Sequence, residues 1–172
     1  EMNGLQSIRL IKRSLEKACA HPEDVKARAD MLLGSYFGGC AISAGIGIAH
    51  IMAQPIGAMY DIPHGDACSI FLPLAMEFNL DNATKKYADI AEALGVAVHG
   101  AADRDNAMRA IEEVKRIRTS IGAPDSLKSY LAGQVADLDF MVETVKKTTG
   151  HITCNPRKVD EQVYRQIFEL AL

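Results

Sequence analysis

Two histidines lie close together in an apolar, glycine-rich part of the sequence. His50 and His64 are fourteen positions apart, and Gln54 follows His50 by one helical turn. Neutral imidazole is a good ligand for divalent iron and zinc. We expect His50 to end one helix and His64 to begin the next, with residues 55–63 as a connection that brings both imidazoles to one point. The spacing favours a metal site, although each histidine is also compatible with a buried or capping position in a helix bundle.

Two imidazoles do not complete a catalytic metal site, which generally has at least three protein ligands. Asp61 and Asp66 lie nearby in the sequence, but each is more typical of a turn or of a helix start. The alternative is that the missing ligands belong to another part of a longer protein. We therefore expect this chain to bind a metal only weakly by itself.

The elements that would position these residues are helices. Apolar side chains recur at helical spacing along most of the chain, and no convincing run of alternating strand pattern is present. The predicted helices cover residues 5–20, 23–54, 64–79, 83–94, 104–121, 126–131, 137–148 and 161–171, the last behind Asp160 as N-cap. The sequence predicts an all-α fold, a multi-helix bundle of about seven to nine helices that forms one domain over residues 1–172.

Composition excludes several classes of protein. The chain has 172 residues, of which 48% are apolar and 24% charged, and its net charge of −3 gives no electrostatic reason to bind nucleic acid or an anionic membrane. The apolar runs are shorter than the ~18–20 residues of a membrane span. The four cysteines form no CxxC pair and are interpreted as free thiols, so we expect a soluble, cytoplasmic protein.

The chain is too short to hold both a dinucleotide-binding domain and a catalytic domain. We therefore expect it to begin partway through a larger protein.

Two further patterns do not support a binding site. Gly45-x-Gly47 has no preceding strand and no third glycine in the required place, so it is not a dinucleotide fingerprint. The basic residues Lys115, Arg116 and Arg118 lie beside the acids Glu112 and Glu113, which is typical of a solvated helix face.

The residues around the two histidines resemble those of the iron-containing alcohol dehydrogenases. The similarity begins with a long, specific pattern, Gly45-x-Gly-x-x-His50-x-x-x-Gln54-Pro-x-Gly-Ala-x-x-x-x-Pro63-His64-Gly65. It continues through Phe71-Leu-Pro73, Met76-Glu-Phe-Asn79, residues 86–95, Ile121-Gly-Ala-Pro124 and Asn155-Pro-Arg157. The resemblance thus covers essentially the whole chain.

This resemblance implies a fold and a metal site. The chain is similar to the C-terminal helical domain of the dehydroquinate synthase-like fold, without the Rossmann-like N-terminal domain that binds the dinucleotide. Family members hold Fe²⁺, or in some cases Zn²⁺, with one aspartate and three histidines. His50 and His64 match the last two histidines, whereas the expected Asp-x-x-x-His pair would precede this chain.

The resemblance also implies an activity. The parent protein would transfer a hydride between a small alcohol or aldehyde and NAD or NADP, as an alcohol dehydrogenase or aldehyde reductase, with the isolated chain inactive. It would work with an N-terminal dinucleotide-binding domain and form a homo-oligomer.

The sequence departs from the family pattern at two places. Gln54 replaces a histidine that relays a proton in most relatives, and since an amide does not titrate near neutral pH, we expect Gln54 to orient the cofactor or substrate as a catalytic and cofactor-binding residue. His151 replaces a cysteine that in relatives often faces the substrate pocket, and Ala41, where some relatives have bulkier aromatic residues, would widen the same pocket. Both are predicted to contact substrate.

Two other functions remain open at this stage. One is a non-catalytic helical module for assembly or ligand binding, which the missing Asp-x-x-x-His pair favours for this chain. The other is a glycerol dehydrogenase-like or dehydroquinate synthase-like activity on the same fold, although the histidine spacing is longer in those enzymes. The substrate, the choice of NAD or NADP and the choice of iron or zinc are not determined.

Overall fold

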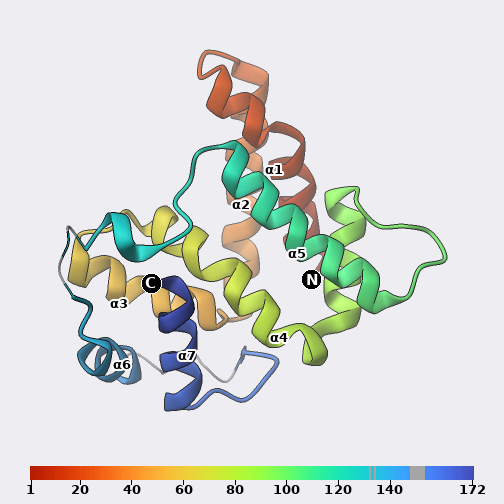
Figure 1. Cartoon of the computed structure of the whole chain (residues 1–172). Helices are drawn as coiled ribbons and strands as arrows, with labels where there is room; N and C mark the ends of the chain where they lie inside the picture. Colours follow the sequence, from red (N-terminus) through yellow and green to blue (C-terminus); the bar gives the residue numbers. More distant parts are fainter. Residues whose placement is uncertain (132, 134, 148–153) are drawn as a thin grey trace. The chain divides into compact units, whose positions relative to one another are not determined.

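The computed structural model describes residues 1–131, 133, 135–147 and 154–172, and over this part of the chain it contains helices and no β-strand (Figure 1). The elements are α1 (Met2–Ala20), α2 (Val25–Ile42), α3 (Ile48–Tyr60), α4 (His64–Leu94), α5 (Asp103–Ser120), the short 3₁₀ helix η1 (Leu127–Ser129), α6 (Leu138–Lys146) and α7 (Glu161–Ala171). The predicted all-α class and helix number are confirmed. None of these helices combines the length and the apolar character needed to cross a bilayer.

The chain divides into two compact units, each made of two stretches of sequence. Unit 1 contains residues 1–45 and 83–121, and unit 2 contains residues 46–82 and 122–172. The long helix α4 contributes its first part to unit 2 and its last part to unit 1. Both predicted metal ligands, His50 and His64, belong to unit 2.

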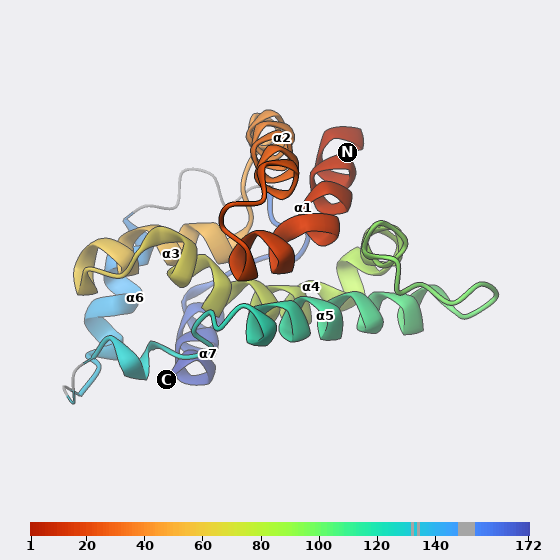
Figure 2. The ribbon, with the colours of Figure 1, turned by 90° about the horizontal axis from the view of Figure 1, so that it is seen from above.

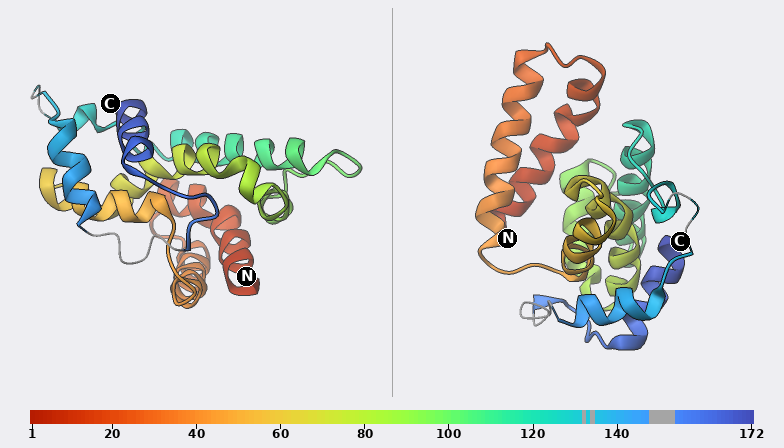
Figure 3. Two further views of the ribbon diagram at one scale, coloured as in Figure 1. Left: turned by 90° about the horizontal axis from the view of Figure 1, so that it is seen from below. Right: turned by 90° about the vertical axis from the view of Figure 1, so that its left-hand side faces the viewer.

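In unit 1, α1 and α2 form a closely packed pair of neighbouring helices (Figures 2 and 3). Gly34 is buried where the helices meet, and a Cβ there would lie only 2.9 Å from Cγ1 of Ile11. The Ser7 hydroxyl donates a hydrogen bond of 2.7 Å to the Gly34 carbonyl, and Arg13 donates to Asp30 across the same contact. The small residue and the polar bonds together fix the spacing of the two helices.

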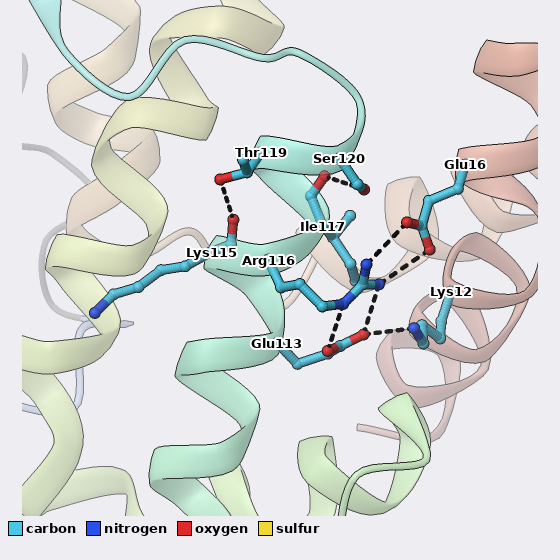
Figure 4. A network of polar contacts seen from close by, with 8 residues as sticks. All are labelled: Lys12, Glu16, Glu113, Lys115, Arg116, Ile117, Thr119 and Ser120. Carbon is cyan, nitrogen blue, oxygen red and sulfur yellow. Dashed lines mark hydrogen bonds and ion pairs between the residues drawn. The ribbon is translucent and has the colours of Figure 1, made fainter.

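A network of charged side chains joins α1 to α5 within unit 1 (Figure 4). Arg116 donates to both carboxylate oxygens of Glu16 at 2.9 and 3.0 Å and also to Glu113, which pairs with Lys12. The hydrogen bonds from Arg116 lower the pKa of the Glu16 carboxyl to about 2. Arg116 is exposed, as expected of a solvated helix face, and its charge is paired with two acids of unit 1.

Unit 2 has its own apolar core, formed by α3, the first part of α4, α6 and α7. The rings of Phe71 and Phe168 are fully buried and meet edge to face with centroids 5.7 Å apart. At the start of α7 the Asp160 carboxylate accepts a hydrogen bond from the Val163 backbone, as the predicted N-cap requires. This core holds the helix starts that carry the histidines.

Three predicted helix boundaries are wrong, and one of them involves a proline. The helix expected over residues 23–54 is interrupted after Ile42, at a turn where Gly45 adopts a φ of +113°, and α3 then continues through Pro55 to Tyr60. The segments expected at 64–79 and 83–94 are one helix, α4, which includes the buried Pro73. An internal proline removes one backbone hydrogen bond, and both prolines are packed in an apolar core that holds the helix together around them.

Candidate metal centre

His50 lies in the first turn of α3, not at the end of a helix as predicted. The N-cap of α3 is Gly47 in an extended conformation, and its carbonyl accepts the backbone hydrogen bond of Ile51. Ile48 and Ile51 are buried in the core, which fixes the first turn and leaves His50 half-buried beside them.

A distant residue, Asn155, holds the start of α3. Its side-chain oxygen accepts hydrogen bonds from the Ile48 backbone at 3.3 Å and from the Asn79 amide at 3.0 Å. Its own amide donates to the Asn79 side-chain oxygen at 2.8 Å. Asn79, in α4, is only 4% exposed, so this pair of amides ties the beginning of α3 to the helix that carries His64.

A tight turn between α3 and α4 places His64. Asp61 ends α3 in the left-handed conformation with a φ of +53°, and the Ile62 backbone donates back to the Gly57 carbonyl at 2.9 Å. A Cβ at Gly57 would lie 3.1 Å from the Ile62 carbonyl oxygen, so a glycine allows the chain to approach this closely. α4 then begins at His64. The two histidines therefore occupy the first turns of two successive helices.

The structure brings the side chains of His50 and His64 together. Their ring centroids are 4.7 Å apart, with an angle of 74° between the ring planes. Burial, and secondarily the nearby His64 ring, lower the pKa of His50 below its usual value. A lowered pKa favours the neutral imidazole, which is the form that binds metals.

Sequence analysis missed a third residue at this point, Cys68. Its Sγ lies 3.4 Å from Nε2 of His64 and 3.9 Å from Nδ1 of His50. The three ligand atoms all lie within 4.8 Å of one another, and no second cluster of this kind occurs in the described part of the chain. The available signal was the His64-x-x-x-Cys68 spacing at a helix start, which places both side chains on one face.

Asp61 and Asp66 are not part of this cluster. Asp61 ends α3, and Asp66 lies in the first turn of α4, where its carboxylate accepts a hydrogen bond of 2.5 Å from the Tyr130 hydroxyl. Each has the turn or helix-start position that the sequence indicated.

The other predicted site residues are placed as follows. Gln54 is exposed and lies one turn after His50 on the same face of α3. Ala41 is half-buried near the end of α2 in unit 1. A Cβ added to Gly4 in α1 would lie 3.8 Å from the Cβ of Ala41. His151 is outside the described residues. The roles of all three stay predictions.

The donor atoms of this cluster fit a divalent metal. Two imidazole nitrogens and one thiol sulfur form a ligand set that zinc and iron accept, whereas magnesium and calcium prefer oxygen ligands. All three side chains start from helix turns anchored in the core, so little reorganisation is needed for them to meet one ion.

Comparison with known proteins assigns the chain to a family. The sequence model of the Fe-containing alcohol dehydrogenase family, C-terminal part, matches residues 1–172. The chain belongs to the iron-containing alcohol dehydrogenase family. This membership and the helical fold confirm the resemblance that the sequence motifs indicated.

Individual family members are similar over nearly the whole chain. The 1,3-propanediol dehydrogenase of Klebsiella pneumoniae is 38% identical over 169 residues, which make up 98% of this chain and 43% of the relative. The NAD-dependent methanol dehydrogenase of Bacillus methanolicus is 33% identical over 98% of this chain and 44% of its own length. A crystal structure of a 1,3-propanediol oxidoreductase superposes with a TM-score of 0.93 at 36% identity, covering 100% of this chain and 45% of that protein. The chain thus spans less than half the length of these relatives.

Proposed function

We propose that this chain is the helical, metal-binding half of an alcohol dehydrogenase or aldehyde reductase. The observation that carries the proposal is the meeting of His50 and His64, with ring centroids 4.7 Å apart, at the starts of two helices. The membership of an iron-containing dehydrogenase family supports the same conclusion. The substrate is a small alcohol or the corresponding aldehyde.

In this proposal His50 and His64 bind a divalent ion through their imidazole nitrogens. When bound, Fe²⁺ or Zn²⁺ supplies Lewis-acid polarisation of the substrate oxygen. Asn155 and the core residues of α3 hold His50 in position, and the turn after Tyr60 holds His64. The chain's own contribution is therefore a rigid pair of ligands and the orientation of the substrate beside them.

Roles are proposed for three further residues. Gln54 lies one turn beyond His50 and orients the cofactor or substrate by hydrogen bonding, because its amide both donates and accepts but does not titrate near neutral pH. Ala41 and His151 contact the substrate. With an amide at position 54, the proton exchanged with the substrate passes through another group or water.

The proposed cofactor is a nicotinamide dinucleotide, bound by a separate dinucleotide-binding domain. A relative that is 33% identical is an NAD-dependent methanol dehydrogenase, which supports a nicotinamide cofactor without deciding between NAD and NADP. We propose a homo-oligomer for the parent protein, as expected from the family resemblance.

The test uses the full-length protein that contains this chain. Metal content and NAD(P)H-dependent aldehyde reduction are measured in the wild type, in a His50→Ala/His64→Ala double variant and in a His21→Ala control, whose histidine is exposed in unit 1. The double variant should lose both bound metal and activity, whereas the control should keep both. Retained metal and activity in the double variant would contradict the proposal. Metal binding without reductase activity in the wild type would favour a non-catalytic helical module.

A further inference from the structure

We propose that Cys68 is a third metal ligand, which with His50 and His64 lets this chain bind a divalent ion such as Zn²⁺ without help from residues elsewhere. This inference rests on the proposed metal site and extends it, since the sequence pattern implied only the two histidines as ligands from this chain. It also changes the expectation of weak metal binding, which followed from a count of two ligands.

The two distances from the Cys68 sulfur to the imidazole nitrogens support this assignment. With Zn–S near 2.3 Å and Zn–N near 2.0–2.1 Å, a sulfur and a nitrogen ligand at the tetrahedral angle are separated by about 3.5 Å. The Cys68 Sγ lies 3.4 Å from Nε2 of His64 and 3.9 Å from Nδ1 of His50. The Cys68 sulfur therefore lies close to the separation expected between two ligands of one ion, from both imidazole nitrogens.

The position of Cys68 in α4 makes this spacing a property of the fold. Cys68 follows His64 by four residues, so both side chains lie on one face of the first helical turns. The neighbours Ala67 and Ile70 are 0% exposed, which anchors this part of the helix. Because the packed helix holds the backbone of Cys68 and His64 in place, the entropic cost of ordering these ligands when an ion enters is reduced.

The ligand set also determines which ions the site prefers. On coordination the thiol S–H bond is broken, its proton passes to the solvent and the sulfur forms a bond to the metal as thiolate. Thiolate and imidazole select zinc and similar ions over magnesium and calcium. In the isolated chain, these three ligands would leave one position of a tetrahedral site open.

Cobalt(II) provides a direct spectroscopic test, because a thiolate bound to Co²⁺ gives a charge-transfer absorption that histidine ligands do not give. The 172-residue chain is titrated with Co²⁺ under anaerobic conditions. Both the charge-transfer absorption and the visible d–d bands of Co²⁺ in a protein site should appear. Adding Zn²⁺ should remove both by displacement.

Variants identify the sulfur. Cys68→Ser should lose the charge-transfer absorption and at least about tenfold in Zn²⁺ affinity, since even the loss of a second-shell partner costs 10–100-fold. Cys19→Ser, at an exposed position in α1, should behave as the wild type. A triple variant, Cys19→Ser/Cys40→Ser/Cys154→Ser, retains Cys68 alone among the cysteines and should keep the absorption. Circular dichroism checks that each variant is folded.

The outcomes separate this inference from the proposed function. Intense d–d bands without a charge-transfer absorption would show metal at the histidines and would overturn the role of Cys68 alone. Bands that persist in His50→Ala/His64→Ala would contradict the proposed metal site. A charge-transfer absorption that survives Cys68→Ser would assign the sulfur to another cysteine and would also overturn the inference.

Discussion

At the scale of single residues, Asn155 shows how a side chain remote in sequence supports the metal centre. It satisfies the first backbone donor of α3 and pairs with the buried amide of Asn79 in α4. Because His50 follows two residues after Ile48, the hydrogen bond to the Ile48 backbone fixes the turn from which the imidazole projects. The family motif Asn155-Pro-Arg157 thus has a structural explanation that requires no contact with substrate.

Replacing Asn155 by alanine should destabilise the chain and weaken metal binding. The change leaves the buried Asn79 amide without its partner, and an unsatisfied buried polar group costs about 1–3 kcal/mol. Urea denaturation measures the free energy of unfolding, and Zn²⁺ titration measures the affinity. Asn82→Ala, at an exposed position in α4, serves as the control and should change neither quantity appreciably. Unchanged stability in Asn155→Ala would show that the amide pair contributes nothing.

At the scale of elements, the pair α1–α2 depends on a glycine at the contact. Gly34→Ala should lower the free energy of unfolding by about 1–3 kcal/mol, because its Cβ would lie 2.9 Å from Cγ1 of Ile11 and overpacking has costs of this size. Gly39→Ala in the same helix has no atom within 4 Å of the added Cβ, so it should stabilise by up to about 1 kcal/mol through helix propensity. Chemical denaturation of both variants measures the difference. Equal effects would contradict the close approach of the two helices.

The charged network between α1 and α5 should make stability depend on acid pH. The pKa of Glu16 is lowered to about 2 from its ordinary value of 4.5, so its contribution is present above about pH 4.5 and is lost as the pH falls toward 2. The free energy of unfolding, measured by urea denaturation across this range, should fall less steeply in Glu16→Gln than in the wild type. High salt should reduce the difference by screening. Identical pH slopes would show that the pairing with Arg116 does not stabilise the fold.

At the scale of the whole molecule, metal binding should be visible as stability. A ligand that binds the folded state alone stabilises by about 2.7 kcal/mol when its free concentration is about 100 times its Kd. Zn²⁺ should therefore raise the thermal melting temperature of the wild-type chain, and a chelator should reverse the change. The His50→Ala/His64→Ala variant should show no such shift. A shift of equal size in that variant would place the bound ion elsewhere.

Much of this architecture follows from local sequence rules. The helical class, α7 with its Asp160 cap and the boundaries of α5 were predictable from periodicity and capping residues. The continuation of α3 through Pro55 was not, because tertiary packing keeps a helix intact where local propensity predicts a break. His50 was consequently assigned to the end of a helix when it lies at the beginning of one.

The candidate site was only partly predictable for a related reason. The spacing of His50 and His64 drew attention to both residues, and the structure brings them together. Cys68 was not singled out, because the four cysteines form no CxxC pair and their spacings match no zinc motif, so they were interpreted together as free thiols. Only the placement of α3 against the start of α4 shows that its sulfur faces two imidazoles.

The division of the chain has a consequence for its synthesis. Because the chain passes between the units three times, after residues 45, 82 and 121, neither unit is complete until the chain has entered it a second time. As the polypeptide emerges from the ribosome, unit 1 is complete once residue 121 has been translated. By then the segment with both histidines has been made, but Asn155 and α7 have not. The turns that carry His50 and His64 are therefore translated before Asn155 and α7, the residues that hold them in place.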